Sequence, residues 1–134
     1  MTTHLIRNLS VALLAAASMY AQGPLTVQVP FQFHVGDSML PSGEYRVDTD
    51  AGPGVVRLKS ADAKSSVMIL SYAVETLAAP SMGKLVFNRY GDDYFLCQIW
   101  KPDNNTGREL QKSRHEIEVA AGARRGVQSI VATK

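Results

Sequence analysis

The amino-acid sequence predicts a mainly β protein: a single antiparallel sandwich or small barrel of six to seven strands, with one short helix near the C-terminus. Apolar residues recur at every second position in several runs, which is typical of strands that bury one face. Turn residues, chiefly glycine, proline, asparagine and aspartate, separate these runs at nearly regular intervals. Helical start and stop signals occur only after residue 112.

The strands are predicted from these alternating runs. They span residues 25–35, 44–48, 55–59, 66–76, 84–90 and 93–101, and residues 127–132 form either a seventh strand or an ordered tail. Pro30 has no N–H to donate, so we expect it at a sheet edge or at a bulge. Tyr45 and Val47 should point inward. The run 66–76 carries apolar side chains on both faces, which predicts a central strand.

Gly91-Asp92 predicts a two-residue type II′ turn, because glycine stands at the first central position. This turn pairs Tyr90 with Asp93 and Arg89 with Tyr94, and directly paired residues share a face. If this pairing continues without interruption, it places a mixed set of side chains on one face of the hairpin. These are Leu85, Phe87, Arg89, Tyr94, Leu96 and Trp100, with Val86, Tyr90, Phe95, Cys97 and Ile99 on the opposite face.

The candidate binding surface lies around this turn and consists of Arg89, Tyr94, Trp100, Tyr90 and Asp92. An arginine stacked on a tyrosine ring forms a cation–π pair that suits a sugar ring or an anionic group. The alternative is a structural arginine whose aliphatic stem covers the rim of the sheet.

The C-terminal part contains the one predicted helix. Ser113 and Glu116 have the spacing of a capping box, which predicts a helix from Arg114 to about Ala121 with Gly122 as its C-cap. Arg108-Glu109 and the basic residues at 112–114 resemble a solvated entry to this helix. Residues 108–134 carry six basic and three acidic side chains, and this net charge of +3 would favour anionic surfaces weakly.

The N-terminus has the pattern of a secretory signal peptide: Arg7 without an acid, a nine-residue apolar run, and small residues up to Ala21. The apolar run is too short to span a membrane. We therefore expect cleavage near Ala21, a secreted or periplasmic mature protein without a transmembrane span, and a single β-rich domain over residues 22–134.

The sequence lacks the patterns of several functional classes. The formal net charge of +2 argues against a nucleic-acid binder. With Cys97 as the single cysteine, we predict no metal site and no cofactor. We expect its thiol to pack as a small hydrophobe; the alternative is a disulfide between two chains. Ser81-Met82-Gly83-Lys84 matches the S-x-x-K pattern of serine enzymes by chance, because it straddles a turn and lacks the companion motifs.

These observations favour an exported, non-enzymatic β-domain that acts as a binding or envelope-associated interaction module. Its partner would be a small molecule, a glycan or an envelope protein. One alternative is a small secreted hydrolase or isomerase with a site assembled from distant residues, such as Glu44, Asp92, Arg89 and His34. Another is a lipocalin-like carrier of an apolar ligand, which needs about eight strands and an open interior.

Three stretches of the sequence together carry a family pattern: Val29 to Asp37 with Leu40 to Tyr45, Lys84 to Leu96, and Gly107 to Arg114. The order VPFxFxVGD, LPxGEY, KLVFxRYGDxYFL and GRELxKSR resembles small signal-peptide-bearing bacterial proteins without an assigned activity. Gln111 stands where that pattern has proline. The resemblance implies an exported β-domain and transfers no catalytic residue.

Overall fold

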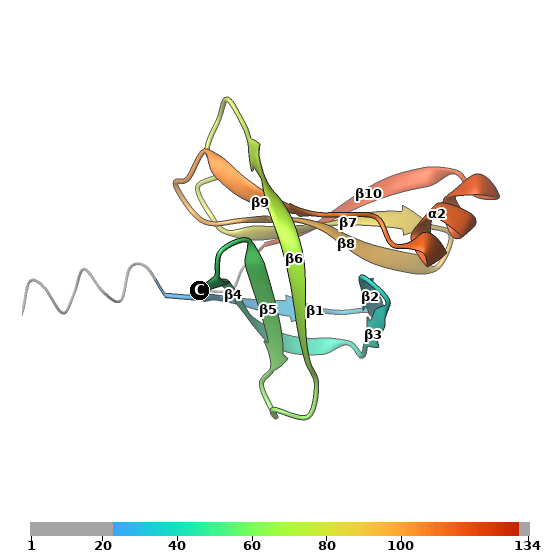
Figure 1. The fold of residues 1–134 in the computed structure, drawn as a ribbon, viewed down its shortest axis with the longest axis horizontal. Helices are drawn as coiled ribbons and strands as arrows, with labels where there is room; N and C mark the ends of the chain where they lie inside the picture. The colour runs from blue at the N-terminus through green and yellow to red at the C-terminus, as the bar shows by residue number, and fades with distance from the viewer. Residues whose placement is uncertain (1–22, 132–134) are drawn as a thin grey trace, which may run out of the picture.

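A computed structural model describes residues 23–131 of the chain (Figure 1). The predicted signal peptide, its cleavage near Ala21, and Ala132 lie outside the described residues. The described elements are β1 Leu25–Val29, β2 Phe33–Val35, β3 Ser38–Leu40, β4 Gly43–Gly52, β5 Val55–Ser60, β6 Ser66–Glu75, β7 Lys84–Tyr90, β8 Asp93–Trp100, β9 Thr106–Leu110, α2 Arg114–Ala121 and β10 Arg125–Val131. The predicted class is confirmed: the protein is mainly β, with one short helix near the C-terminus.

The ten strands form one hydrogen-bonded sheet in the order β1-β4-β5-β6-β9-β8-β2-β3, with β7 beside β8 and β10 beside β7. The first half of β6 pairs with β5 and its second half pairs with β9. We call β1, β4, β5 and the first half of β6 the first sheet, and the remaining strands the second sheet. Figure 1 shows β6 crossing from one to the other. All pairings are antiparallel except the single parallel bridge between β2 and β8.

A single hydrophobic core receives side chains from both sheets. Its fully buried members include Val27, Val47 and Leu58 of the first sheet and Leu85 and Phe87 of the second sheet. Tyr45 and Val47 point inward as predicted. At about 25 cal/mol per Å² of apolar surface, burial of these side chains is the main source of stability.

Pro30 divides the first predicted strand into two. β1 ends at Val29, directly before the proline, and β2 begins at Phe33. The alternation survives the break, because Val29 and Phe33 are both fully buried. The short strand β3, which pairs with β2, was not predicted, because three residues are too few to show a period. The number of strands therefore exceeds the six to seven expected.

The central strand β6 buries only one of its faces. Val67 and Ile69 pack against the core, whereas Met68, Leu70 and Tyr72 are 60%, 72% and 49% exposed. The predicted central position is confirmed, because β6 stands between β5 and β9 in the sheet order, but the apolar side chains of its outer face are not buried. The reason is that β6 connects two sheets around one core, so that only its inner side is covered.

The hairpin of β7 and β8 has the predicted turn but not the full predicted register. Gly91 has a φ of +63°, Asp92 does not have a positive φ, and Arg89 pairs with Tyr94, as a type II′ turn requires. Beyond Phe87, however, a bulge shifts the register, and Leu85 pairs with Ile99 instead of Gln98. This exchanges the faces of the last residues: Ile99 enters the core, and Trp100 lies on the outer face.

Arg108 and Glu109 belong to the strand β9 and not to a helix entry, which corrects the prediction. The sequence did not predict this strand, because it lacks alternating apolar residues. Polar side chains stabilise its position instead. Arg108 donates from Nε to Ser71 Oγ at 2.8 Å and from Nη2 to the Ser71 carbonyl at 2.6 Å. Gly107 allows the ring of Trp100 to lie close against the strand, since an added Cβ would come within 2.6 Å of that ring.

The helix α2 begins and ends where the sequence predicts. Its N-cap Ser113 accepts a hydrogen bond from the Glu116 backbone N–H at 3.1 Å. The carboxylate of Glu116 accepts hydrogen bonds from Asn88 and Tyr90 on β7, and Glu116 is only 4% exposed. Glu116 therefore attaches α2 to the outer face of the second sheet.

Candidate functional site

A row of polar side chains crosses the outer face of the first sheet. The register pairs Thr26 with Arg46, Arg46 with Lys59, and Lys59 with Ser66, so these four residues of β1, β4, β5 and β6 share one face. Their chain neighbours Val27, Tyr45, Val47 and Leu58 are buried on the opposite face. The alternation of the first sheet thus places these polar residues on its solvent side.

A bulge in β4 determines which charges face one another in this row. Near the turn, Gly52 pairs with Val55, and an uninterrupted ladder from there would place Asp48 opposite Lys59. The register instead shifts between Asp48 and Gly52, so that Asp48 faces Arg57 and Arg46 faces Lys59. The shift keeps Asp48 opposite a cation, now Arg57, and leaves Arg46 and Lys59 as a facing pair of like charges.

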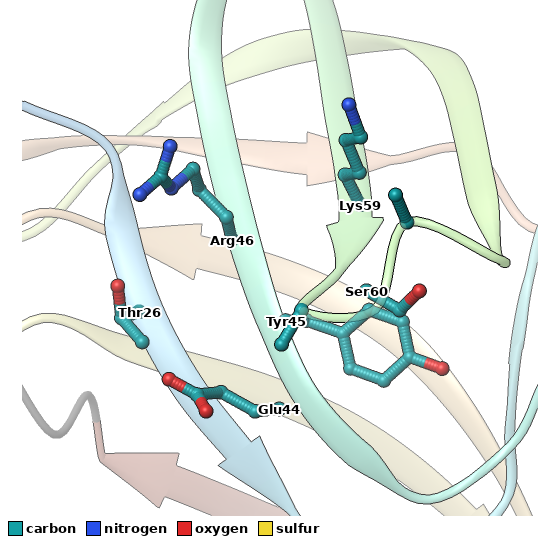
Figure 2. A pocket seen from close by; sticks show the side chains of 8 residues that line it. Thr26, Glu44, Tyr45, Arg46, Lys59 and Ser60 are labelled. Atoms are coloured by element: carbon teal, nitrogen blue, oxygen red, sulfur yellow. The ribbon is translucent and has the colours of Figure 1, made fainter.

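The paired cations Arg46 and Lys59 border two depressions. The first, of about 340 Å³, is lined by Thr26, Glu44, Tyr45, Arg46, Lys59, Ser60, Ala61 and Ala63. Figure 2 shows the Arg46 guanidinium and the Lys59 amine extending from neighbouring strands, with the Glu44 carboxylate near Thr26. The second, of about 550 Å³, is lined by Pro24, Arg46, Asp48, Arg57, Lys59, Ser66 and Met68. We call the two together the basic groove.

The charges of the groove are only partly neutralised. Arg57 Nη2 lies 3.2 Å from Asp48 Oδ2 and forms an ion pair. Within residues 23–131, neither Arg46 nor Lys59 has a carboxylate oxygen within 4 Å. Three cations and one acid line the larger depression, hence a net charge of +2. Like charges placed directly opposite each other across strands destabilise a sheet, and an anion between them removes that cost.

The structure brings two of the five predicted binding residues together. The Arg89 guanidinium lies 5.4 Å from the centre of the Tyr94 ring, which confirms the expected cation–π pair. That ring also stacks on Phe31 at 3.7 Å, and Arg89 Nε donates to the Gly91 carbonyl at 2.8 Å. Asp92 is exposed at the turn. These contacts fasten the end of the hairpin to the core.

The other two predicted residues lie on the opposite face of the hairpin. The Tyr90 hydroxyl donates to Glu116 at 3.0 Å, and Trp100 Nε1 donates to Gln98 Oε1 at 3.1 Å. Gln98 in turn donates to Glu109 at 2.7 Å. The five residues therefore do not form one surface. Tyr90 faces away from Arg89 by the alternation of β7, as the predicted pairing already placed it, and the bulge in β8 turns Trp100 away from Tyr94.

The residues considered for catalysis are also dispersed. Glu44 lies in β4 and lines the smaller depression of the basic groove, whereas His34 is buried in β2 and stacks on Phe95 at 4.3 Å. His34 Nε2 is 3.9 Å from Asp93 Oδ1. Burial and the neighbouring His115 lower the pKa of His34, and Asp93 opposes this effect.

Cys97 is half-buried in β8, and its thiol is free. Burial raises the pKa of this thiol, and the carboxylates of Glu109 and Glu116 raise it further. In the part of the chain that the structure describes, no three histidine, cysteine, aspartate or glutamate residues cluster in a way that could hold a metal ion.

Sequence reasoning missed the basic groove. Arg46, Arg57 and Lys59 occupy alternate positions in two predicted strands, which places each on a solvent face. The missing information was the register between those strands, which the bulge in β4 determines.

Comparison of the chain with protein-family models, with curated proteins and with solved structures gave no match. Among residues 23–131, none of the helices has the length and apolar character needed to cross a membrane.

Proposed function

We propose that this protein is an exported, non-enzymatic binding module that holds an anionic ligand in the basic groove. The observation that carries the proposal is the pairing of Arg46 with Lys59 across neighbouring strands, beside a depression and with no carboxylate oxygen of residues 23–131 within 4 Å of either side chain. A guanidinium and an ammonium at directly paired positions of neighbouring strands can both donate to one phosphate, sulfate or carboxylate group. Export rests on the signal-peptide pattern of residues 1–21.

The packing of the core supports surface binding over an internal carrier site. Phe33 makes edge-to-face contacts with Tyr45 at 5.2 Å and with Phe87 at 5.5 Å, so aromatic rings occupy the centre of the space between the sheets. A lipocalin-like carrier needs that space for its ligand.

Calorimetric titration of the purified protein with sodium tripolyphosphate at low salt tests the proposal. We expect saturable binding that weakens as salt is added. The double variant Arg46→Gln, Lys59→Gln should lose at least tenfold in affinity, because two charge-assisted contacts are removed. The matched control Arg89→Gln removes an exposed arginine outside the groove and should bind within twofold of the wild type. Equal binding by the wild type and the double variant, or no binding at all, would refute the proposal.

The repulsion within the groove can be tested without any ligand. Lys59→Gln removes one of two facing cations and should raise the free energy of unfolding by about 0.2–0.5 kcal/mol at low salt. Lys112→Gln, an exposed lysine outside the groove, is the control and should cause no such gain. A lower stability of Lys59→Gln would show that the facing cations do not repel each other.

A further inference from the structure

The exposed apolar residues of β6 adjoin the basic groove. Met68, Leu70 and Tyr72 stand at alternate positions of one strand and therefore on one face. Met68 pairs directly with Arg57 and lines the 550 Å³ depression together with Arg46 and Lys59. We call Met68, Leu70 and Tyr72 the apolar ridge; it continues the outer face of the first sheet toward β9.

The position of the ridge is not required by the fold. The core contacts of β6 come from Val67 and Ile69, whereas Leu70 is 72% exposed. An outward-facing strand position is usually polar, as at Arg46 and Lys59 on the neighbouring strands. A row of exposed apolar side chains near Arg46 and Lys59, which have no carboxylate partner within the described part of the chain, therefore marks a surface that contacts a partner.

The chemistry of the two neighbouring features determines the class of partner. The cations of the basic groove bind a negatively charged group. The side chains of the apolar ridge are removed from water when they insert into an apolar layer. An anionic lipid surface offers both at once, since headgroup phosphates lie directly above the acyl chains. The Tyr72 ring, whose hydroxyl donates to Glu109, suits the boundary between these two layers.

From this arrangement we infer that the anionic ligand of the groove is the headgroup layer of a membrane that contains anionic lipids, with the apolar ridge inserted at its surface. The inference rests on the proposed function, because the same Arg46 and Lys59 bind the headgroups. Beyond the proposed function, it specifies a lipid surface as the source of the anionic groups and assigns the apolar ridge a contact with that surface.

Cosedimentation with vesicles tests the inference. The probes are vesicles of phosphatidylcholine alone and vesicles with one quarter phosphatidylglycerol. We expect binding to the anionic vesicles at least tenfold tighter than to the neutral ones. The variant Leu70→Ser, Tyr72→Ser, which leaves the groove-lining Met68 in place, should weaken binding to the anionic vesicles at least fivefold while its affinity for tripolyphosphate stays within twofold. Both substitutions are at exposed positions, so the melting temperature should change little.

Two further variants separate the possible failures. Ile117→Ser on α2, a position 58% exposed, is the matched control and should bind vesicles like the wild type. Arg46→Gln, Lys59→Gln should weaken binding to both tripolyphosphate and the vesicles. Unchanged vesicle binding by Leu70→Ser, Tyr72→Ser would overturn the inference and leave the proposed function intact. A dimer in sedimentation velocity that this ridge variant abolishes would also overturn it, because a second copy would then cover the ridge. Absence of tripolyphosphate binding by the wild type would instead contradict the proposed function.

Discussion

Glu116 is the side chain whose removal should most clearly show how α2 is held on the sheet. Its carboxylate accepts hydrogen bonds from Asn88 Nδ2 and from the Tyr90 hydroxyl, both at 3.0 Å, and the residue is 4% exposed. Glu116→Ala leaves both donors without this partner in a buried setting. The N-cap of the helix is unaffected, because Ser113 accepts from the backbone N–H of residue 116.

The magnitude follows from these two contacts. Hydrogen bonds to a charged group contribute about 1.5–3 kcal/mol each. The loss of stability in the variant is smaller than the sum of the two, because the variant no longer has to bury a carboxylate. We therefore expect Glu116→Ala to lower the free energy of unfolding by about 3 kcal/mol. In a domain of this size, about 4 °C per kcal/mol gives a decrease in melting temperature of roughly 12 °C. Urea denaturation followed by far-ultraviolet circular dichroism measures the loss.

Glu118→Ala is the matched control, because Glu118 is an exposed acid on the same helix. We expect its stability to lie within about 0.5 kcal/mol of the wild type. Both donors bond to the same oxygen, Oε2, so Glu116→Gln keeps an oxygen that can accept both hydrogen bonds but lacks the negative charge. Its stability should lie between those of the wild type and Glu116→Ala. Equal stabilities of Glu116→Ala and Glu118→Ala would refute the reasoning that this carboxylate attaches α2 to the sheet.

Three more predictions concern other parts of the second sheet. Gly107→Ala should destabilise the protein by about 1–3 kcal/mol in urea, because its Cβ would lie 2.6 Å from the Trp100 ring. Gly122→Ala, whose Cβ has nothing within 4 Å, should not, and equal effects would contradict the close packing at Gly107. His34 has a pKa lowered from 6.5 by burial, so the unfolded state binds the proton more tightly. The contribution of His34 to the free energy of unfolding should be present above pH 6.5 and be lost as the pH falls through the folded-state pKa. His34→Gln should therefore reduce the difference in stability between pH 7.5 and pH 5. An unreduced difference would show that other groups cause the pH dependence. Cys97, with a pKa raised by burial, should react at least tenfold more slowly with a thiol reagent at pH 8 than it does in urea. Rapid labelling of the native protein would mean that the thiol is accessible.

Local signals in the sequence were sufficient for the turns and for the helix. The type II′ turn at Gly91-Asp92 depends on glycine at one position, and the start of α2 depends on Ser113 as its N-cap, so each is determined within a few residues. The inward positions of Tyr45 and Val47 followed from alternation alone, because a strand with one buried face repeats every two residues.

Features that depend on an irregularity in a strand could not be predicted in this way. An extra residue in β8 moves Trp100 to the outer face, although the run around it is apolar at nearly every position and fits either register. The bulge in β4 likewise places Arg46 opposite Lys59. The predicted binding surface therefore divided between two faces, and the basic groove depends on a register that no local pattern specifies.

The central claim is that the basic groove binds anions. Nuclear magnetic resonance of the ¹⁵N-labelled protein, titrated with tripolyphosphate, tests it residue by residue. The account predicts the largest changes in backbone amide shifts at Thr26, Arg46 and Lys59, with small changes at Arg89 and Tyr94. Changes centred on the hairpin of β7 and β8, or no changes at millimolar tripolyphosphate, would contradict it.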